Sequence, residues 1–280
     1  MYILFLTSLA LIAFAANSIL CRLALYDGLM DAGSFTSFRL ISGAVVLGLI
    51  FSFRSKQQQA LQASGGWLAA SLLFVYAITF SYAYIALDIA TGALILFTAG
   101  QVTLILSVVV LGGRLSFLEW MGLCLALMGF VYLMLPSATT PSWYGFILMS
   151  ISGVAWGFYT LLGKGSKQPL ADTTSNFMRC LPLVVLLMFF SFEYTHFNFQ
   201  SLLYAVLSGA IASGVGYTIW YMALEKLEMI HAAVVQLFVP VLAAVGGLLF
   251  LDEVITMRLL LSGSIILCGI LLVILQRNKA

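Results

Sequence analysis

Apolar residues fill most of this chain in long stretches that are separated by short polar connections. A helix that crosses a bilayer needs about 20 consecutive, mostly apolar residues. The runs do not alternate in polarity as the strands of a membrane β-barrel do. The pattern therefore predicts an all-α membrane protein with ten transmembrane helices, at residues 2–25, 33–53, 66–87, 89–111, 117–135, 143–163, 173–194, 200–224, 229–251 and 257–276.

Composition narrows the class further. The 280 residues are 63% hydrophobic and 8% charged, whereas a soluble domain carries about 25% charged residues. A net charge of +2 is too small to indicate a nucleic-acid partner. The four cysteines lie far apart in apolar runs, which favours neither a metal site nor a disulfide framework. We therefore expect no cofactor, and partners limited to the lipid bilayer and a small-molecule substrate.

The placement of Lys and Arg predicts the orientation. No Lys or Arg precedes the first span, so we expect a transmembrane helix there and no cleaved signal peptide. Basic residues gather on the cytoplasmic side of membrane proteins. Both termini are therefore expected in the cytoplasm, in a cell membrane that we take to be a bacterial inner membrane. That orientation leaves only Arg258 clearly outside and puts eight basic residues inside: Arg54, Lys56, Arg114, Lys164, Lys167, Lys226, Arg277 and Lys279.

The second half of the chain aligns with the first at an offset of about 140 residues. Each half has five spans, an odd number, so the second half must enter the membrane from the opposite side. We therefore predict two inverted five-helix repeats, residues 1–135 and 143–280, an organisation typical of transporters. The alignment pairs Arg39 with Arg179, Gly129 with Gly269, and Gly100 with Pro240.

Three segments also resemble a known family. They are Phe38-Arg39-Leu40 near the start of the second span, Gly92–Gly129 with its Leu-Gly-Gly-Arg-Leu-Ser turn, and Ala232–Gly269 with Phe250-Leu251-Asp252-Glu253. In these segments the chain resembles the drug/metabolite transporter superfamily, in particular its ten-helix EamA-type members, although Gly113 stands where that family commonly has Glu. The resemblance covers essentially the whole chain. It implies a transporter, from a family whose members move amino acids, other metabolites, nucleotide sugars or drugs.

Interrupted helices at the midplane indicate the substrate site in inverted-repeat carriers. Gly100 and Pro240 occupy equivalent places in spans 4 and 9, so we expect helix interruptions at both. Gln101 and Gln236 stand close to them, and Asn17 lies inside span 1. Polar side chains at that depth face the interior of the bundle. They are candidate substrate contacts, and interhelical hydrogen bonding is the alternative.

Aromatic residues cluster in spans 3, 6 and 8. Tyr and Trp combine an apolar ring with a polar group, which suits the wall of a pocket for an amphipathic solute. The alternative is a belt of aromatic residues at the membrane interface. Trp156 is the strongest pocket candidate, because it lies near the middle of its span. The predicted pocket residues of these spans are Tyr84, Trp156, Tyr159, Tyr217 and Tyr221.

Arg39 and Arg179 each lie about six residues inside their predicted spans. A charge at that depth is costly and is usually functional or paired. The two side chains could attract an anionic substrate group or gate a mouth of the pathway. Alternatively they extend to the interface and cap neighbouring helix ends, which we favour.

The predicted spans carry no acid at mid-depth, and His196 and His231 lie near span ends. Because proton-driven carriers commonly use such groups at depth, we expect transport without proton coupling. We predict a secondary transporter rather than an enzyme, exporting small neutral or zwitterionic metabolites, with amino acids the best candidates. The alternatives are an intramembrane enzyme, a channel, or a carrier of anionic metabolites that uses Arg39 and Arg179. Small-residue faces such as Gly153–Gly157 predict close helix contacts within the chain, with a homodimer as the alternative.

Overall fold

The computed structural model describes residues 2–53, 66–110, 112, 114–136, 140–164, 166–227 and 229–277. Arg54, Lys56, Gly113 and Lys279 lie outside the described residues, as do the side chains of His231 and Arg277. A π-helix, Ser208–Val215, joins α9 to α10. The α-helices are α1 (Tyr2–Leu25), α2 (Ala32–Ser52), α4 (Trp67–Ala83), α5 (Ile89–Val110), α6 (Phe117–Met134), α7 (Trp143–Gly163), α8 (Pro169–Ser191), α9 (Phe199–Leu207), α10 (Gly216–Leu224), α11 (Met229–Gln236), α12 (Val239–Leu251) and α13 (Met257–Arg277).

The helices confirm the all-α, multi-pass fold. Within the described ranges, nine helical segments are long and apolar enough to cross a membrane, and α4, with 17 residues, is slightly shorter. Helix α8 begins at Pro169, four residues before the predicted start at 173. Proline is well placed in a first helical turn, where its missing N–H costs nothing. The earlier start places Arg179 near the middle of the helix rather than about six residues inside its span.

The ninth predicted span consists of two helices, α11 and α12, separated by Leu237 and Phe238. Pro240 accounts for the break, because it has no N–H to donate to the carbonyl of Gln236. Helix α5, in contrast, runs unbroken through Gly100, so the predicted interruption there is wrong. Glycine keeps its N–H. Its role here is close packing, because a Cβ at this position would lie 3.3 Å from the carbonyl oxygen of Gly153 in α7.

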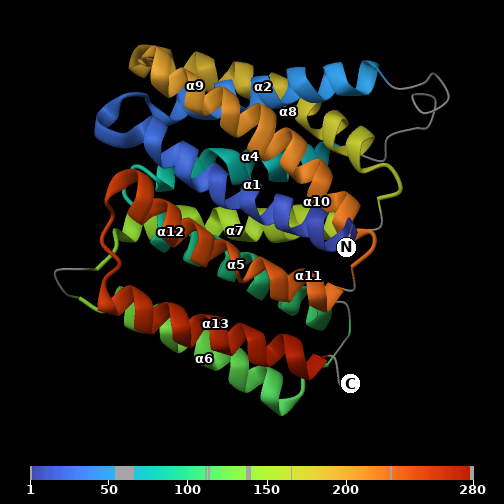
Figure 1. The fold of residues 1–280 in the computed structure, drawn as a ribbon, viewed down its shortest axis with the longest axis vertical. Helices are drawn as coiled ribbons and strands as arrows, with labels where there is room; N and C mark the ends of the chain where they lie inside the picture. Colours follow the sequence, from blue (N-terminus) through green and yellow to red (C-terminus); the bar gives the residue numbers. More distant parts are fainter. Residues whose placement is uncertain are drawn as a thin grey trace.

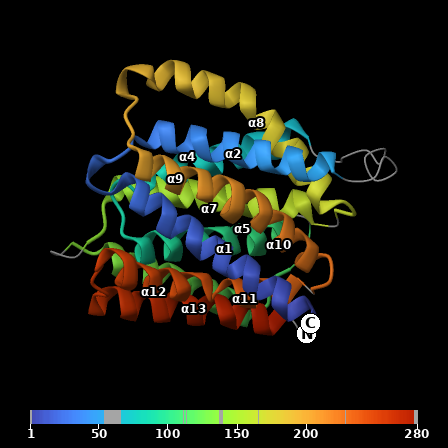
Figure 2. The ribbon, with the colours of Figure 1, turned by 45° about the horizontal axis from the view of Figure 1, so that its top comes forward.

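Figure 1 shows the helices lying side by side, with the two ends of the chain at the same end of the bundle. We call the end that holds the start of α1 and the end of α13 the terminal end, and the opposite end the far end. Helices α6 and α13 form one edge of the bundle, and α2 and α8 lie at the other edge in both views (Figures 1 and 2). Helices α1, α4, α7 and α10 lie between these edges and supply most of the central side chains.

Small residues bring α6 and α13 into backbone contact. A Cβ on Gly122 would lie 2.6 Å from the carbonyl oxygen of Gly269, and a Cβ on Gly269 would lie 2.6 Å from that of Gly122. About two turns further along α6, a Cβ on Gly129 would lie 3.1 Å from the carbonyl oxygen of Ser262. Larger residues would force the two helices apart, since backbone offers no room to adjust.

Candidate functional site

Arg39 in α2 lies at the centre of the candidate site. Its side chain is only 1% exposed, so the expectation that it extends to the membrane interface is wrong. The Nε–H donates to Ser213 Oγ at 3.0 Å. Nη2 donates to the hydroxyl oxygens of Tyr76 at 3.0 Å and Tyr217 at 2.8 Å. The guanidinium also lies over two aromatic rings, 5.2 Å from the centroid of Tyr76 and 4.8 Å from that of Phe80.

Asn17 in α1 belongs to the same polar network. Its Oδ1 accepts from the hydroxyls of Ser208 at 2.7 Å and Ser213 at 3.1 Å, and its Nδ2 donates to Tyr217 at 3.5 Å. Both serines belong to the π-helix, a conformation often found at functional sites. The network therefore ties α1, α2 and α10 together around the Arg39 guanidinium.

Aromatic rings surround this network. Trp156 lies at their centre, with ring centroids 5.0 Å from Tyr217, 5.2 Å from Tyr76 and 5.4 Å from Phe14. The indole Nε1 of Trp156 is buried and has no hydrogen-bond partner. We call Asn17, Arg39, Tyr76, Trp156 and Tyr217 the central chamber. Three of the predicted pocket residues, Asn17, Trp156 and Tyr217, are thus brought together here, with Arg39 beside them.

A cavity of about 360 Å³ and a smaller one of about 170 Å³ lie at opposite ends of the bundle. The smaller cavity opens at the terminal end between α4, α7, α8 and α10, and Tyr159, Asn176 and Tyr221 help to line it. The ring of Tyr159 contacts Tyr221 at 5.9 Å and Trp156 at 5.8 Å. Tyr159 therefore separates this cavity from the central chamber.

Both glutamines are buried in the bundle. Gln101 is 2% exposed and Gln236 is 3% exposed. Gln236 Nε2 donates to the carbonyl of Ala232 in its own helix at 3.4 Å. Neither glutamine is among the described residues that line the cavity beside Tyr221. A single cavity shared by Gln101, Trp156, Tyr221 and Gln236 stays a prediction.

Tyr84 lies outside the central chamber, although the sequence grouped it with the pocket residues. It sits at the far end, where its hydroxyl donates to the carbonyl of Ile89 at 3.3 Å and its ring fills the space over Gly92. Its own carbonyl accepts from Arg22 Nη1 at 3.0 Å.

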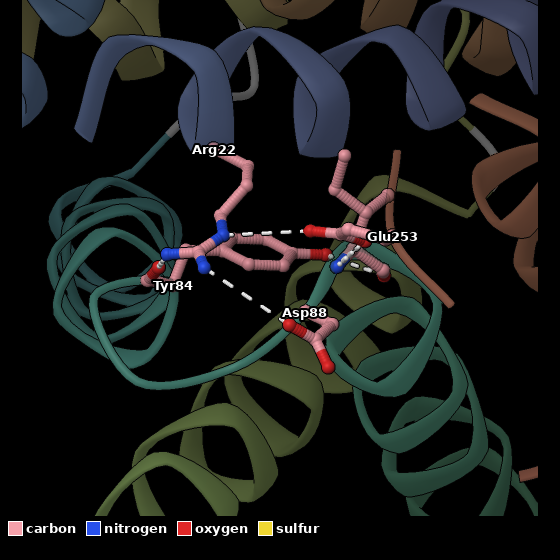
Figure 3. Close-up of polar contacts among 5 residues, drawn as sticks. Arg22, Tyr84, Asp88 and Glu253 are labelled. Carbon is pink, nitrogen blue, oxygen red and sulfur yellow. Dashed lines mark hydrogen bonds and ion pairs between the residues drawn. The ribbon is translucent and has the colours of Figure 1, made fainter. Parts of the chain in front are cut away.

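Arg22 closes the far end by joining three segments (Figure 3). Its guanidinium lies 3.5 Å from Glu253, between α12 and α13, and 4.0 Å from Asp88, just before α5. Glu253 also accepts from the backbone N–H of Ile89 at 2.8 Å. Burial raises the pKa of Glu253, although the Ile89 N–H and Arg22 oppose that rise. We call Arg22, Tyr84, Asp88 and Glu253 the far-end latch. The cavity of about 360 Å³ lies against its outer side, lined partly by Asp88 and Glu253.

A second set of contacts closes the far end between α2 and α8. The backbone N–H of His196 donates to Asp31 Oδ2 at 3.1 Å, and the Asp31 N–H donates to the His196 carbonyl at 3.2 Å. The rings of Phe38 and Phe197 stack edge to face at 5.1 Å. Both far-end closures join helices of the first half to segments of the second half.

Arg179 is not part of the chamber. It lies on the outer helix α8, half-buried, and donates to Ser175 one turn earlier. The sequence also missed the latch, whose members each look like an ordinary helix-end residue. In the sequence, only the 140-residue offset between the two halves indicates that segments far apart in the chain could meet at the same end of the bundle. In the described part of the chain, no group of three or more His, Cys, Asp or Glu could hold a metal ion.

The chain has relatives among known proteins. The model of the EamA-like transporter family matches residues 143–275. An uncharacterized protein of Pseudomonas aeruginosa is 48% identical over 98% of this chain and 95% of its own length. An uncharacterized transporter of Bacillus subtilis is 24% identical over 84% of this chain and 85% of its own. A solved crystal structure shares the fold, with a TM-score of 0.65 at 18% identity, over 97% of this chain and 98% of that one.

Proposed function

The chain belongs to the EamA-like transporter family, and from that premise we propose that it is a secondary carrier that moves a small neutral or zwitterionic metabolite by alternating access. Amino acids are the first candidates. The Bacillus subtilis relative is named as a transporter, and the fold is that of a multi-pass membrane protein. A bacterial inner membrane suits the bacterial origin of two of the relatives.

An asymmetric closure around the central chamber is the observation that carries the proposal. The far-end latch and the Asp31–His196 contacts close one end. A cavity of about 170 Å³ reaches Tyr159 from the other end. A carrier needs a resting state of this kind, because a site open to both sides at once would leak. The aromatic walls and the few convergent polar groups suit a small amphipathic solute.

We also propose that the two halves form inverted repeats and that the termini face the cytoplasm. The contacts between α6 and α13 support the repeat. The offset of 140 residues pairs Gly122 with Ser262 and Gly129 with Gly269, and the observed contacts join Gly122 to Gly269 and Gly129 to Ser262. When each residue is replaced by its partner under this offset, the contact of Gly122 with Gly269 becomes that of Ser262 with Gly129. A two-fold axis that relates the halves requires this. With cytoplasmic termini, the open cavity faces the cytoplasm, from which an exporter collects its substrate.

Transport in this proposal runs down the substrate gradient. Among the side chains that the structure describes, every Asp and Glu lies in a connection or in the first turn or so of a helix. No carboxylate at mid-depth is therefore available to carry a coupling proton.

The test is uptake of labelled amino acids into proteoliposomes that contain the purified protein. Saturable uptake that unlabelled substrate inhibits is the expected result. Uptake that rises linearly with concentration would favour a channel, and chemical conversion of the solute would favour an enzyme. Either result, or a complete lack of uptake across the amino acids, would refute the proposal.

A further inference from the structure

We propose that Arg39 binds a carboxylate of the transported solute, so that the substrates are small carboxylates with an apolar body. This inference rests on the proposed function, and it specifies the chemistry of the same site. A zwitterionic amino acid belongs to this class, whereas amines and uncharged solutes do not.

The hydrogen bonds of Arg39 leave part of its guanidinium free. A guanidinium has five N–H donors. One of them bonds Ser213, and the two on Nη2 bond Tyr76 and Tyr217. Nη1 is buried and has no partner within the described chain. Its two N–H groups are therefore available, and a carboxylate is the group whose geometry suits a guanidinium edge best.

The charge of Arg39 also lacks a counter-ion. A buried charge is stable only when it is paired, and the two neighbouring rings compensate it only in part. No carboxylate among the described residues forms an ion pair with Arg39. Arg22 provides the contrast, because it is partly buried, with 18% of its side chain exposed, and has Glu253 at 3.5 Å and Asp88 at 4.0 Å. Arg179 is only partly buried on α8 and donates to Ser175 in its own helix, so its surroundings are not comparable. An anionic ligand would supply what Arg39 lacks.

Further unpartnered polar groups line the approach from the terminal end. The indole N–H of Trp156 is a second buried donor beside Tyr217. Asn176 Oδ1 is a buried acceptor without a partner, and Asn176 lines the open cavity. A series of unsatisfied groups of this kind is rare in a packed interior. The series leads from the cavity, past Tyr159, to Arg39.

The rings around Trp156 are in contact, so a solute can enter only when the helices that carry them separate. Tyr217 lies just after the π-helix, and Ser213 lies within it. A π-helix has wider turns and poorer hydrogen bonds than an α-helix. Movement at this point would free Arg39 from Ser213 and Tyr217 together. The carboxylate would then replace contacts that the resting state makes within the protein.

Matched acids and amides test the inference without any variant. The probes are L-phenylalanine and L-leucine, each compared with its carboxamide, which keeps the side chain and ammonium but loses the carboxylate charge. Uptake into proteoliposomes and thermal stabilisation of the purified protein are measured with each probe. We expect the acids to be taken up and to stabilise at concentrations at least about tenfold lower than the amides, as the loss of a charged hydrogen bond predicts.

Two variants then assign the preference to Arg39. Arg39→Gln should abolish the preference for acids, and Arg39→Lys, which keeps the charge but not the two-pronged edge, should retain part of it. Arg179→Gln is the matched control, which removes an intramembrane arginine outside the chamber and should keep the full preference. Melting temperatures without ligand identify a variant that fails to fold, in which case Arg39→Lys carries the comparison.

The outcomes separate this inference from the proposed function. Equal uptake of acids and amides would overturn the role of Arg39 and leave the carrier intact. Stabilisation by acids without any uptake would overturn the carrier and support Arg39. Neither stabilisation nor uptake would overturn both. A folded Arg39→Gln protein that still prefers acids would also overturn the role of Arg39.

Discussion

The replacement Arg22→Gln should open the far end of the bundle. Glutamine is neutral and cannot form an ion pair with Glu253, so the far-end latch loses its only cation. The charged hydrogen bond from Arg22 to the Tyr84 carbonyl, at 3.0 Å, is lost at the same time. The segments before α5 and after α12 are then no longer joined to the end of α1 (Figure 3). We expect the protein to visit a state open at the far end more often.

The size of the effect follows from these contacts. A hydrogen bond from a charged donor contributes about 1.5–3 kcal/mol. The Arg22 and Glu253 side chains are 18% and 13% exposed, so their ion pair is weakened little by solvent. Its loss leaves Glu253 as a buried, unpaired carboxylate whose pKa burial already raises. A net shift of about 2 kcal/mol is a conservative sum, and it corresponds to an increase of about 30-fold in the open population.

Cys21 provides a reporter within the native sequence. It is fully buried and lies directly before Arg22, on the far-end half of α1. With Cys124, Cys180 and Cys268 replaced by alanine, the rate at which a charged maleimide alkylates Cys21 measures opening. Each rate is divided by the rate in the same protein unfolded in SDS, which removes the effect of residue 22 on thiol reactivity. Arg22→Gln should raise the normalised rate about 30-fold.

Two further variants make the reasoning refutable. Asp88→Asn should change the rate little, because Asp88 is 63% exposed and lies 4.0 Å from Arg22. Glu253→Gln added to Arg22→Gln should restore much of the closure, because the amide keeps an acceptor for the Ile89 N–H without an unpaired charge. An unchanged rate in Arg22→Gln, or a rate in Asp88→Asn that rises as much, would refute the latch.

Three other predictions concern topology, energetics and the glutamines. A cysteine at Thr140 should react with an impermeant reagent in intact cells, and reaction only after cell breakage would reverse the proposed orientation. Uptake of a known substrate should still reach downhill equilibrium when the pH gradient and membrane potential are collapsed, and its loss would show coupling. Gln236→Leu should lower transport while the protein remains folded and abundant. Unchanged transport with a small drop in melting temperature, from a lost hydrogen bond of about 0.6 kcal/mol, would instead make Gln236 a structural residue.

The fold could be predicted from the sequence because length and polarity alone decide where a chain can cross a bilayer. The predicted edges agree with the helices to within a few residues, as at Trp143–Gly163, and Pro169 explains the earlier start of α8. The interruption beside Pro240 was predictable, since proline removes a specific backbone donor. The predicted interruption at Gly100 was wrong because glycine permits a break without requiring one. In α5 this glycine allows the close contact with Gly153.

The chamber was harder to predict, because a sequence gives the depth of a residue in a membrane helix but not the direction in which it points. On a soluble helix, one face is apolar and the other is polar, and the apolar face shows which residues point inward. Here the helices are apolar on all sides, so that signal is absent. Arg39 and Arg179 occupy equivalent places under the offset of 140 residues, yet Arg39 is 1% exposed and Arg179 is only partly buried. In the proposed inverted-repeat arrangement, the two halves share a fold but differ in the side chains that they direct to the two-fold axis. Under that proposal the positive charge of Arg39 lies to one side of the axis, where a solute with a single carboxylate could bind in one orientation.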